Sequence, residues 1–217
     1  PVEVKNNLAS YPELLQKLLF LRGIMTAEQA EEFLNSDYEA GTHDPFLLHD
    51  MDKAAGRLIQ AFEGNEKITI YADFDADGVP GSVILHDFFK KIGHENFDVY
   101  IPHRHHEGYG VHMAALDILS DRGTQLVVTI DVGITYAKEV AYAKTLGMDV
   151  IVTDHHEPSG DVPDAVAVVN PKLGTYPDRM LCGATVAWKL AQATLATLKV
   201  KSEKLKVPRS EEHTSEL

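Results

Sequence analysis

The chain has 217 residues, and its 33 Asp and Glu against 20 Lys and Arg give it a net charge of −13. Apolar residues make up 44% and charged residues 24%, which are ordinary globular values that exclude fibrous and bulk-disordered classes. The acidic balance argues against a protein that coats nucleic acid with basic charge. A local basic groove or bound divalent cations would still admit phosphate substrates.

The single cysteine, Cys182, cannot form an intrachain disulfide and favours a reducing compartment, which we take to be the cytoplasm. No apolar run approaches the roughly 20 residues of a membrane-spanning helix, so we expect no membrane partner. The opening PVEVKNN lacks a charged leader followed by an apolar stretch, so we expect no secretory signal. It also lacks an initiator methionine, and we expect the natural start to lie upstream.

The first part of the chain has helical patterns. Thr26 and Gln29 fit a capping box that opens a short helix through Leu34. Asp50 is predicted to cap the next helix, in which apolar residues at 3–4 spacing form one face: Met51, Ala54, Ala55, Leu58, Ile59 and Phe62. Residues 41–45 look like a joint between these helices. We therefore predict a helical N-terminal extension over residues 1–62.

From Ile68 the pattern alternates between strand and helix. Five short segments, mostly apolar and β-branched, are typical of strands buried on both faces: Ile68–Ala72, Asp98–Ile101, Leu126–Ile130, Asp149–Thr153 and Ala165–Val169. Four helices are expected between and after them: Gly81–Ile92, Val111–Arg122, Thr135–Leu146 and Gly183–Leu198. The first three should end at Gly93, Gly123 and Gly147. This order predicts an α/β domain over residues 63–200, with a mostly parallel open sheet flanked by helices.

Polar residues that can bind metal or phosphate directly follow four of these strands: Asp73, Asp75 and Asp77; Arg104; Asp131; and Asp154, His155 and His156. Because the carboxyl ends of parallel strands meet at one edge of the sheet, we expect these side chains to converge. Carboxylates that lie so close repel each other, and a divalent cation removes that cost. The mixture suits Mn²⁺, Mg²⁺, Zn²⁺ or Fe²⁺, and its carboxylate-rich character favours Mn²⁺ or Mg²⁺.

Each of these signals is weak when taken alone. The Asp-x-Asp-x-Asp-Gly string at 73–78 is equally typical of a solvated turn, and Ile84 stands where a Ca²⁺ loop needs Glu. Asp131 alone fits a helix cap, and two adjacent histidines are often merely exposed. A further set should face solvent or substrate rather than metal: His103, His105 and His106. The combination at consecutive strand ends favours the metal site.

The motifs resemble a known family. YADFDADG (71–78), TIDVGI (129–134) and VTDHHEP (152–158) are similar to the first three motifs of the DHH phosphoesterases. The segments that link them resemble one branch, the RecJ-type single-stranded-DNA exonucleases: FLRGIMTAEQAEEFL (20–34), DPFLLHDMDKAA (44–55), PHRHHEGYGV (102–111), AVAVVNPK (165–172) and LCGATVAWKL (181–190). The resemblance extends over residues 15–198, which identifies residues 63–200 as a DHH phosphoesterase domain.

The resemblance assigns roles to the residues at the strand ends. It implies that two Mn²⁺ or Mg²⁺ ions are bound by four side chains: Asp75, Asp77, Asp131 and His155. Asp73 would bind an ion weakly or support the other ligands from behind. His156 would face the scissile phosphate as an electrophile or acid, and Asp154 would orient the histidine pair. Arg104 would approach the substrate phosphate, which a guanidinium can bind through two parallel hydrogen bonds.

The implied activity is metal-assisted hydrolysis of phosphodiester bonds in single-stranded DNA, as a RecJ-like 5′–3′ exonuclease in DNA repair and recombination. The implied partners are single-stranded DNA and a single-stranded-DNA-binding protein. Two alternatives remain open. One is a DHH phosphodiesterase that acts on short oligonucleotides or cyclic dinucleotides. The other is an inactive DHH-like scaffold that binds a replication partner.

The chain departs from the family pattern near its end. The family's fourth motif, an Asp in a Gly-Thr-hydrophobic-Ala-Asp context that completes the metal site, is absent from the sequence. Residues 201–217 have the composition of a disordered tail, and residues 209–217 resemble a translated sequencing adapter, so we expect this ending to be non-native. We therefore expect an incomplete catalytic domain that hydrolyses DNA poorly by itself.

Overall fold

The computed structural model describes residues 7–204 and divides the chain into two compact units, Pro1–Asp44 and Pro45–Leu217. The division falls within the predicted joint at residues 41–45. A disordered tail was predicted from residue 201, but residues 201–204 belong to a helix, Gly183–Lys204. The rest of that prediction, with the non-native ending at residues 209–217, lies outside the described residues. The domain boundary at residue 62 stays a prediction, and the helix that precedes it packs into the core of the second unit.

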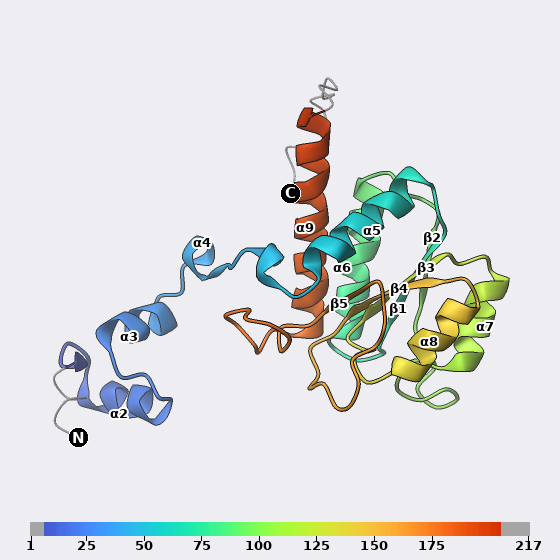
Figure 1. Ribbon diagram of the computed structural model, residues 1–217. Helices are drawn as coiled ribbons and strands as arrows, with labels where there is room; N and C mark the ends of the chain where they lie inside the picture. The colour runs from blue at the N-terminus through green and yellow to red at the C-terminus, as the bar shows by residue number, and fades with distance from the viewer. Residues whose placement is uncertain (1–6, 205–217) are drawn as a thin grey trace. The chain divides into compact units, whose positions relative to one another are not determined.

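The described part of the first unit contains the short helices α2 (Glu13–Leu21), α3 (Ala27–Leu34) and α4 (Tyr38–Gly41) (Figure 1). The predicted capping box is confirmed at the start of α3. The Gln29 amide donates to Thr26 Oγ1 at 3.2 Å, and the Thr26 amide donates to Gln29 Oε1 at 3.3 Å. This unit has a small apolar core centred on Leu8, Leu19 and Ala30.

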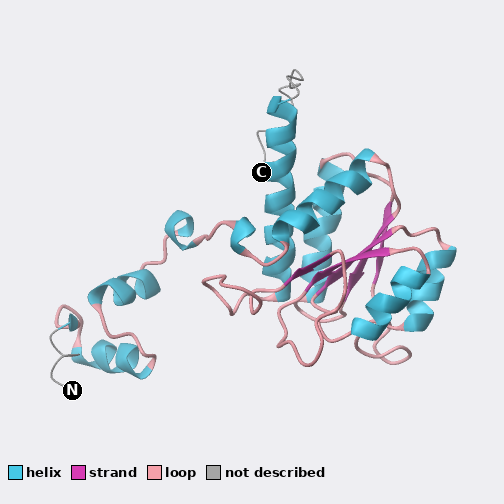
Figure 2. Cartoon of the chain, viewed as in Figure 1, coloured by secondary structure: helices cyan, strands magenta, loops and turns pink. Residues whose placement is uncertain are grey.

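The second unit is built around five parallel strands in the order β2-β1-β3-β4-β5 (Figure 2). The strands are β1 (Ile68–Ala72), β2 (Phe97–Tyr100), β3 (Leu126–Ile130), β4 (Asp149–Thr153) and β5 (Ala167–Val169). Three of them have the bounds that the sequence predicts. Strand β2 begins one residue earlier than expected, and β5 begins two residues later. The predicted α/β fold with a parallel sheet is confirmed.

Helices cover both faces of this sheet (Figure 1). One face is packed by α5 (Met51–Glu63), α6 (Gly78–Lys91) and α9 (Gly183–Lys204), and the other by α7 (Met113–Asp121) and α8 (Ala137–Thr145). A short 3-10 turn, η1 (Pro45–Leu47), precedes α5. Successive side chains of a strand point to opposite faces, so Ile70 joins the first core and Tyr71 the second. None of the described helices is long and apolar enough to cross a membrane.

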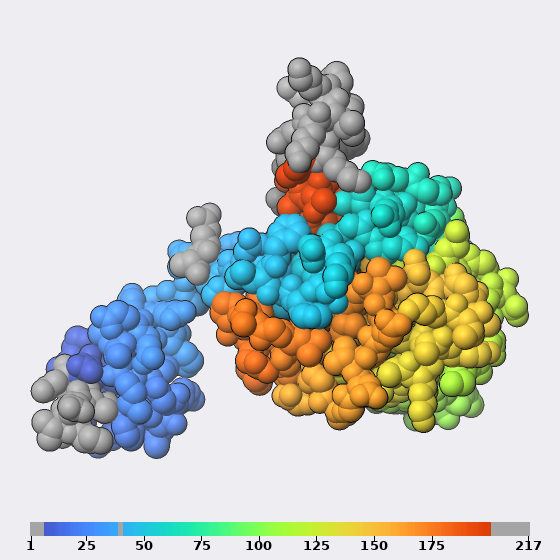
Figure 3. Space-filling view, viewed as in Figure 1, coloured from blue at the N-terminus to red at the C-terminus, as the bar shows by residue number. Residues whose placement is uncertain are grey.

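The predicted role of Asp50 as a helix cap is wrong. Helix α5 begins at Met51 as expected, but Asp50 has a left-handed backbone (φ 54°) and its side chain makes no capping hydrogen bond. A capping residue needs extended backbone to turn its side chain toward the helix amides. The carboxylate instead pairs with Lys53 at 2.6 Å and accepts the Val168 amide at 3.3 Å. It thereby ties the start of α5 to β5. The cyan and orange parts of the chain to which these segments belong lie side by side in Figure 3.

The other helix ends follow the sequence more closely. The glycines that were expected to end three helices, Gly93, Gly123 and Gly147, all have positive φ, between 79° and 82°. Helix α6 begins at Gly78, three residues before the predicted start. The reason is that Asp75 Oδ1 accepts the amides of Asp77 and Gly78, at 2.8 and 2.9 Å, and so closes the turn directly into the helix.

Candidate metal centre

Three aspartates stand side by side where the central strands end. The last residues of β1, β3 and β4 lie in register, and the next residue of each is an aspartate: Asp73, Asp131 and Asp154. Each of their backbone amides donates to the last carbonyl of the neighbouring strand, at 3.0 to 3.2 Å. The hydrogen-bond ladder of the sheet therefore continues one step beyond the strands and fixes the backbone of all three residues.

Asp131 occupies the centre of this row and has unusual surroundings. Its backbone is left-handed, with φ 63°, a conformation that costs a non-glycine residue energy and is common at functional sites. Its side chain is 1% exposed, and among the described residues Oδ1 has no hydrogen-bond partner. Buried carboxylate oxygens without a donor are rare in folded proteins, so this atom is poised to receive a ligand.

Two groups of potential ligand atoms share Asp131. The carboxylates of Asp73, Asp75 and Asp131 form one group, and Asp131, His155 and His156 form the other, each with its ligand atoms within 4.8 Å of one another. His155 Nε2 lies 3.2 Å from Asp131 Oδ1 and 3.6 Å from Asp77 Oδ2. The structure thus brings together every side chain that the sequence predicts as a metal ligand. Their roles as ligands stay predictions.

The electrostatics of the group favour a bound cation. Burial, followed by the charges of Asp75 and Asp77, raises the pKa of Asp131 to about 8. Burial also raises the pKa of Asp73, whose Oδ1 is buried without a hydrogen-bond donor among the described residues. Burial alone would raise the pKa of Asp75 as well, but the backbone amides of Gly78 and Asp77, together with Asp131 and His156, outweigh burial and lower that pKa. Oxygen-rich donors with an imidazole nitrogen fit Mn²⁺ or Mg²⁺, and such a cation would compensate these crowded charges.

Asp154 lies behind the histidine pair and holds it. The carboxylate is 1% exposed, and its Oδ1 accepts the amides of His155 and His156 at 2.7 and 3.0 Å. The same oxygen lies 2.7 Å from His156 Nδ1, while Oδ2 accepts the Ile134 amide at 2.9 Å. This contact with Asp154 raises the pKa of His156. Because the carboxylate accepts at Nδ1, the imidazole presents Nε2 away from Asp154.

Arg104 lies on the same side of the sheet as these carboxylates. Its guanidinium is 4.5 Å from the centre of the Phe74 ring, and its charge opposes the rise in the pKa of Asp73. The side chain is exposed, and so are the three neighbouring histidines that were expected to face solvent or substrate. Glu107 is not a partner of Arg104, since it accepts the hydroxyl of Tyr100 and the amide of His103.

Two residues at the site were missed by the sequence reasoning. The Gly183 amide, at the start of α9, donates to Asp77 Oδ2 at 3.0 Å, and a Cβ at this glycine would lie 2.6 Å from Asp131 Oδ1. The ring of Tyr109 lies 6.1 Å from the ring of His156. Both residues belong to segments, 181–190 and 102–111, that had been noted only for their family resemblance.

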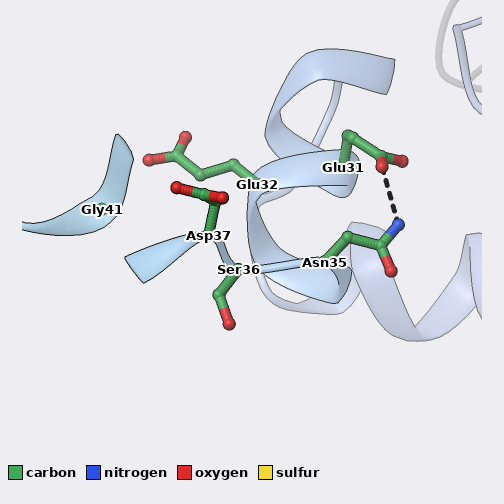
Figure 4. Close-up of a pocket in the computed structure, with 6 residues that line it drawn as sticks. All are labelled: Glu31, Glu32, Asn35, Ser36, Asp37 and Gly41. Atoms are coloured by element: carbon green, nitrogen blue, oxygen red, sulfur yellow. Dashed lines mark hydrogen bonds between the residues drawn. The ribbon is translucent and has the colours of Figure 1, made fainter. Parts of the chain in front are cut away.

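A pocket of about 220 Å³ is lined by residues of the first unit: Glu31, Glu32, Asn35, Ser36, Asp37 and Gly41 (Figure 4). Its one drawn hydrogen bond joins Asn35 Nδ2 to Glu31 Oε1 at 2.7 Å. Every site residue predicted from the sequence belongs to the second unit, and none of them lines this pocket.

A parallel sheet that carries aspartates and a histidine pair at its carboxyl edge is the arrangement expected of a phosphoesterase of the DHH type. The sequence model of the DHH family, N-terminal domain, matches residues 67–213, and the chain belongs to this family. The single-stranded-DNA-specific exonuclease RecJ of Bacillus subtilis is 46% identical over 85% of the chain, which spans 24% of that relative.

Solved structures agree with this assignment. The crystal structure of exonuclease RecJ bound to manganese matches 75% of the chain and 40% of its own length, with a TM-score of 0.64 and 34% identity. RecJ from Thermus thermophilus in complex with Mn²⁺ matches 96% of the chain and 28% of its own length, with a TM-score of 0.65 and 28% identity. The chain therefore spans only a part of the proteins that it resembles.

Proposed function

We propose that the strand-end cluster is the metal-dependent hydrolytic centre of a RecJ-like exonuclease that digests single-stranded DNA. The observation that carries the proposal is Asp131, whose buried Oδ1 accepts no hydrogen bond among the described residues and whose carboxylate belongs to both groups of potential ligand atoms. The names of the relatives support the substrate, and the manganese in related structures supports the ion.

The proposed ligands are those which the sequence indicated: Asp75, Asp77, Asp131 and His155, with Asp73 as an additional carboxylate. When bound, Mn²⁺ or Mg²⁺ supplies Lewis-acid stabilisation of the phosphate and lowers the pKa of a nearby water. The side chains of the protein hold that centre rigidly. Asp75 and Asp77 are fixed by backbone amides, and Asp131 by the strand ladder.

The remaining residues act on the substrate. His156, held by Asp154, presents its ring to the phosphate as a hydrogen-bond donor or acid, and its contact with Asp154 raises the pKa of that ring. Arg104 binds a phosphate oxygen, and its stacking on Phe74 limits the side-chain freedom lost on binding. These local charges offset the net charge of −13, which repels DNA at long range.

We also propose the finer features of this activity. Digestion runs 5′ to 3′, serves DNA repair and recombination, takes place in the cytoplasm and uses a single-stranded-DNA-binding protein as a partner. Residues 63–200 would form the DHH domain, and residues 1–62 its helical extension. The supports are the branch-specific segments of the sequence, the single cysteine and the relatives' names.

The test uses the full-length protein that carries this chain. With Mn²⁺ present, it should release nucleotides from labelled single-stranded DNA but not from the same sequence as a duplex, and labels at either end report the direction. Asp131→Asn should abolish release, whereas Asp117→Asn, which changes an exposed aspartate on α7, should not. Hydrolysis confined to short oligonucleotides or cyclic dinucleotides would replace the exonuclease proposal. Metal binding without any hydrolysis would indicate a scaffold.

A further inference from the structure

The loop between β2 and α7, residues 101–112, is held at two points by a pair of stacked tyrosines. Tyr71 on β1 and Tyr100 on β2 have ring centres 5.3 Å apart and planes inclined by 24°. The Tyr71 hydroxyl donates to the carbonyl of Gly110 at 2.9 Å, and the Tyr100 hydroxyl donates to Glu107 Oε1. The two rings therefore anchor the loop to β2 and to β1, the strand that leads into Asp73, Asp75 and Asp77.

The loop is also closed upon itself. Glu107 Oε2 accepts the His103 amide at 2.7 Å, and the Glu107 amide donates to the His103 carbonyl at 2.9 Å. At Gly110, φ is 112° and a Cβ would lie 2.1 Å from the Tyr136 hydroxyl, so only glycine fits beside that ring. These contacts leave the segment between Glu107 and Gly110 little freedom.

The residue that this arrangement presents is Tyr109. Its ring lies 6.1 Å from His156 and 6.4 Å from Tyr136, yet 46% of its surface is exposed. Its hydroxyl is close enough to Asp154 and Asp131 to feel their charges. Among the described residues, that hydroxyl has no hydrogen-bond partner. The hydroxyl is therefore available to a hydrogen-bond partner from outside the protein.

We propose that Tyr109 is a substrate-contacting residue whose hydroxyl donates a hydrogen bond to a non-bridging oxygen of the phosphate that faces His156. This inference rests on the proposed function, because it concerns the same site. The hydroxyl can donate one hydrogen bond, and it does not contact the neighbouring carboxylates. An oxyanion of the substrate is therefore the acceptor that we assign to it. The competing role is stacking of a nucleobase on the exposed ring. Stacking does not need the hydroxyl oxygen of Tyr109, whereas the hydrogen bond to phosphate does.

The experiment compares Tyr109→Phe and Tyr109→Ala with the parent in the full-length protein. Tyr142→Phe serves as the matched control, because it removes a tyrosine hydroxyl that donates to Asp117 on the α7–α8 face. Two quantities are measured by calorimetry, the affinity for Mn²⁺ alone and the affinity for inorganic phosphate with Mn²⁺ present. Steady-state hydrolysis of single-stranded DNA is measured in parallel.

Tyr109→Phe should weaken phosphate binding and lower kcat/KM by about 10- to 100-fold, as expected for one lost hydrogen bond to a charged group. Its affinity for Mn²⁺ and its thermal midpoint should stay at the parent values, as should every property of Tyr142→Phe. Parent-like phosphate binding by Tyr109→Phe, with loss only in Tyr109→Ala, would establish stacking and overturn the proposal. An equal loss of Mn²⁺ affinity would overturn it too, by showing a structural role. If the parent binds phosphate but hydrolyses no DNA, the proposed function fails. The comparison of phosphate affinities between the parent and the two Tyr109 variants still decides the role of Tyr109.

Discussion

Replacement of Gly183 by alanine tests how tightly the protein positions Asp131. Glycine at this first position of α9 has no side chain, and a Cβ there would lie 2.6 Å from Asp131 Oδ1 and 2.7 Å from its Cβ and Cγ. Ordinary contact begins at 3.4 Å, so the aspartate would have to move. It has no room to do so, because its side chain is 1% exposed and its backbone is fixed by the strand ladder.

The size of the effect follows from this overlap. Inserting a methyl group into a packed site typically costs about 1–3 kcal/mol, and for a domain of this size each kcal/mol lowers Tm by roughly 2–4 °C. The alanine keeps the amide that donates to Asp77, so the loss comes from Asp131 alone. Displacing a residue that supports a metal ligand usually lowers metal affinity by about 10- to 100-fold.

Calorimetric titration with Mn²⁺ and thermal unfolding of the metal-free protein measure the two effects. Gly56→Ala is the matched control, because it lies inside α5 with nothing within 4 Å of an added Cβ. That variant should keep the parent's metal affinity and gain roughly 0.5–1 kcal/mol of stability from helix propensity. Parent-like Mn²⁺ affinity in Gly183→Ala would refute the reasoning, since it would mean that Asp131 can move freely or does not bind the ion.

Three further outcomes are expected. Asp131→Asn should lose Mn²⁺ binding in calorimetry yet raise the Tm of the metal-free protein, because it removes a buried carboxylate crowded by like charges; an unchanged or lower Tm would contradict that account. Arg57→Met should lower the free energy of unfolding in urea by about 1–3 kcal/mol, since the guanidinium bonds two acidic residues at 2.6 and 2.7 Å, and no loss would show these pairs to be inert. Burial lowers the pKa of His94, so below its ordinary value of 6.5 the unfolded chain binds the proton more readily and the folded state loses stability. His94→Phe should therefore show a smaller drop in urea midpoint between about pH 7.5 and about pH 5.5 than the parent, and equal drops would rule out this linkage.

The strands at the centre of the sheet were predictable because their side chains are buried on both faces, which selects continuous apolar segments with clear ends. The two edge strands were placed less accurately. Strand β2 has partly exposed residues, and β5 pairs on one side only, so neither has a sharp boundary in the sequence. The predicted cap at Asp50 failed because its partners, β5 and Lys53, are set by tertiary packing rather than by local spacing.

The residues of the candidate site also fall into two groups, those that the sequence predicts and those that it misses. Its acidic and histidine residues follow strands directly, so strand order alone predicts that they meet. Gly183 contacts Asp77 across a separation of 106 residues, and no local pattern reports such a contact. Tyr109 is placed by the hydroxyl groups of two tyrosines on neighbouring strands, a relation that depends on the register of β1 with β2.

The backbone hydrogen bonds of Asp73, Asp131 and Asp154 continue the ladder of the sheet, so the spacing between these three residues is set by the spacing of the strands. Adjacent strands lie about 4.8 Å apart, and their backbones cannot spread without breaking hydrogen bonds. A larger ion such as Ca²⁺ needs longer bonds and more oxygens than Mg²⁺ or Mn²⁺. The strand spacing therefore limits the radius of the ion that fits the site. Differences in substrate can be accommodated by changes in the loops that project beyond the sheet.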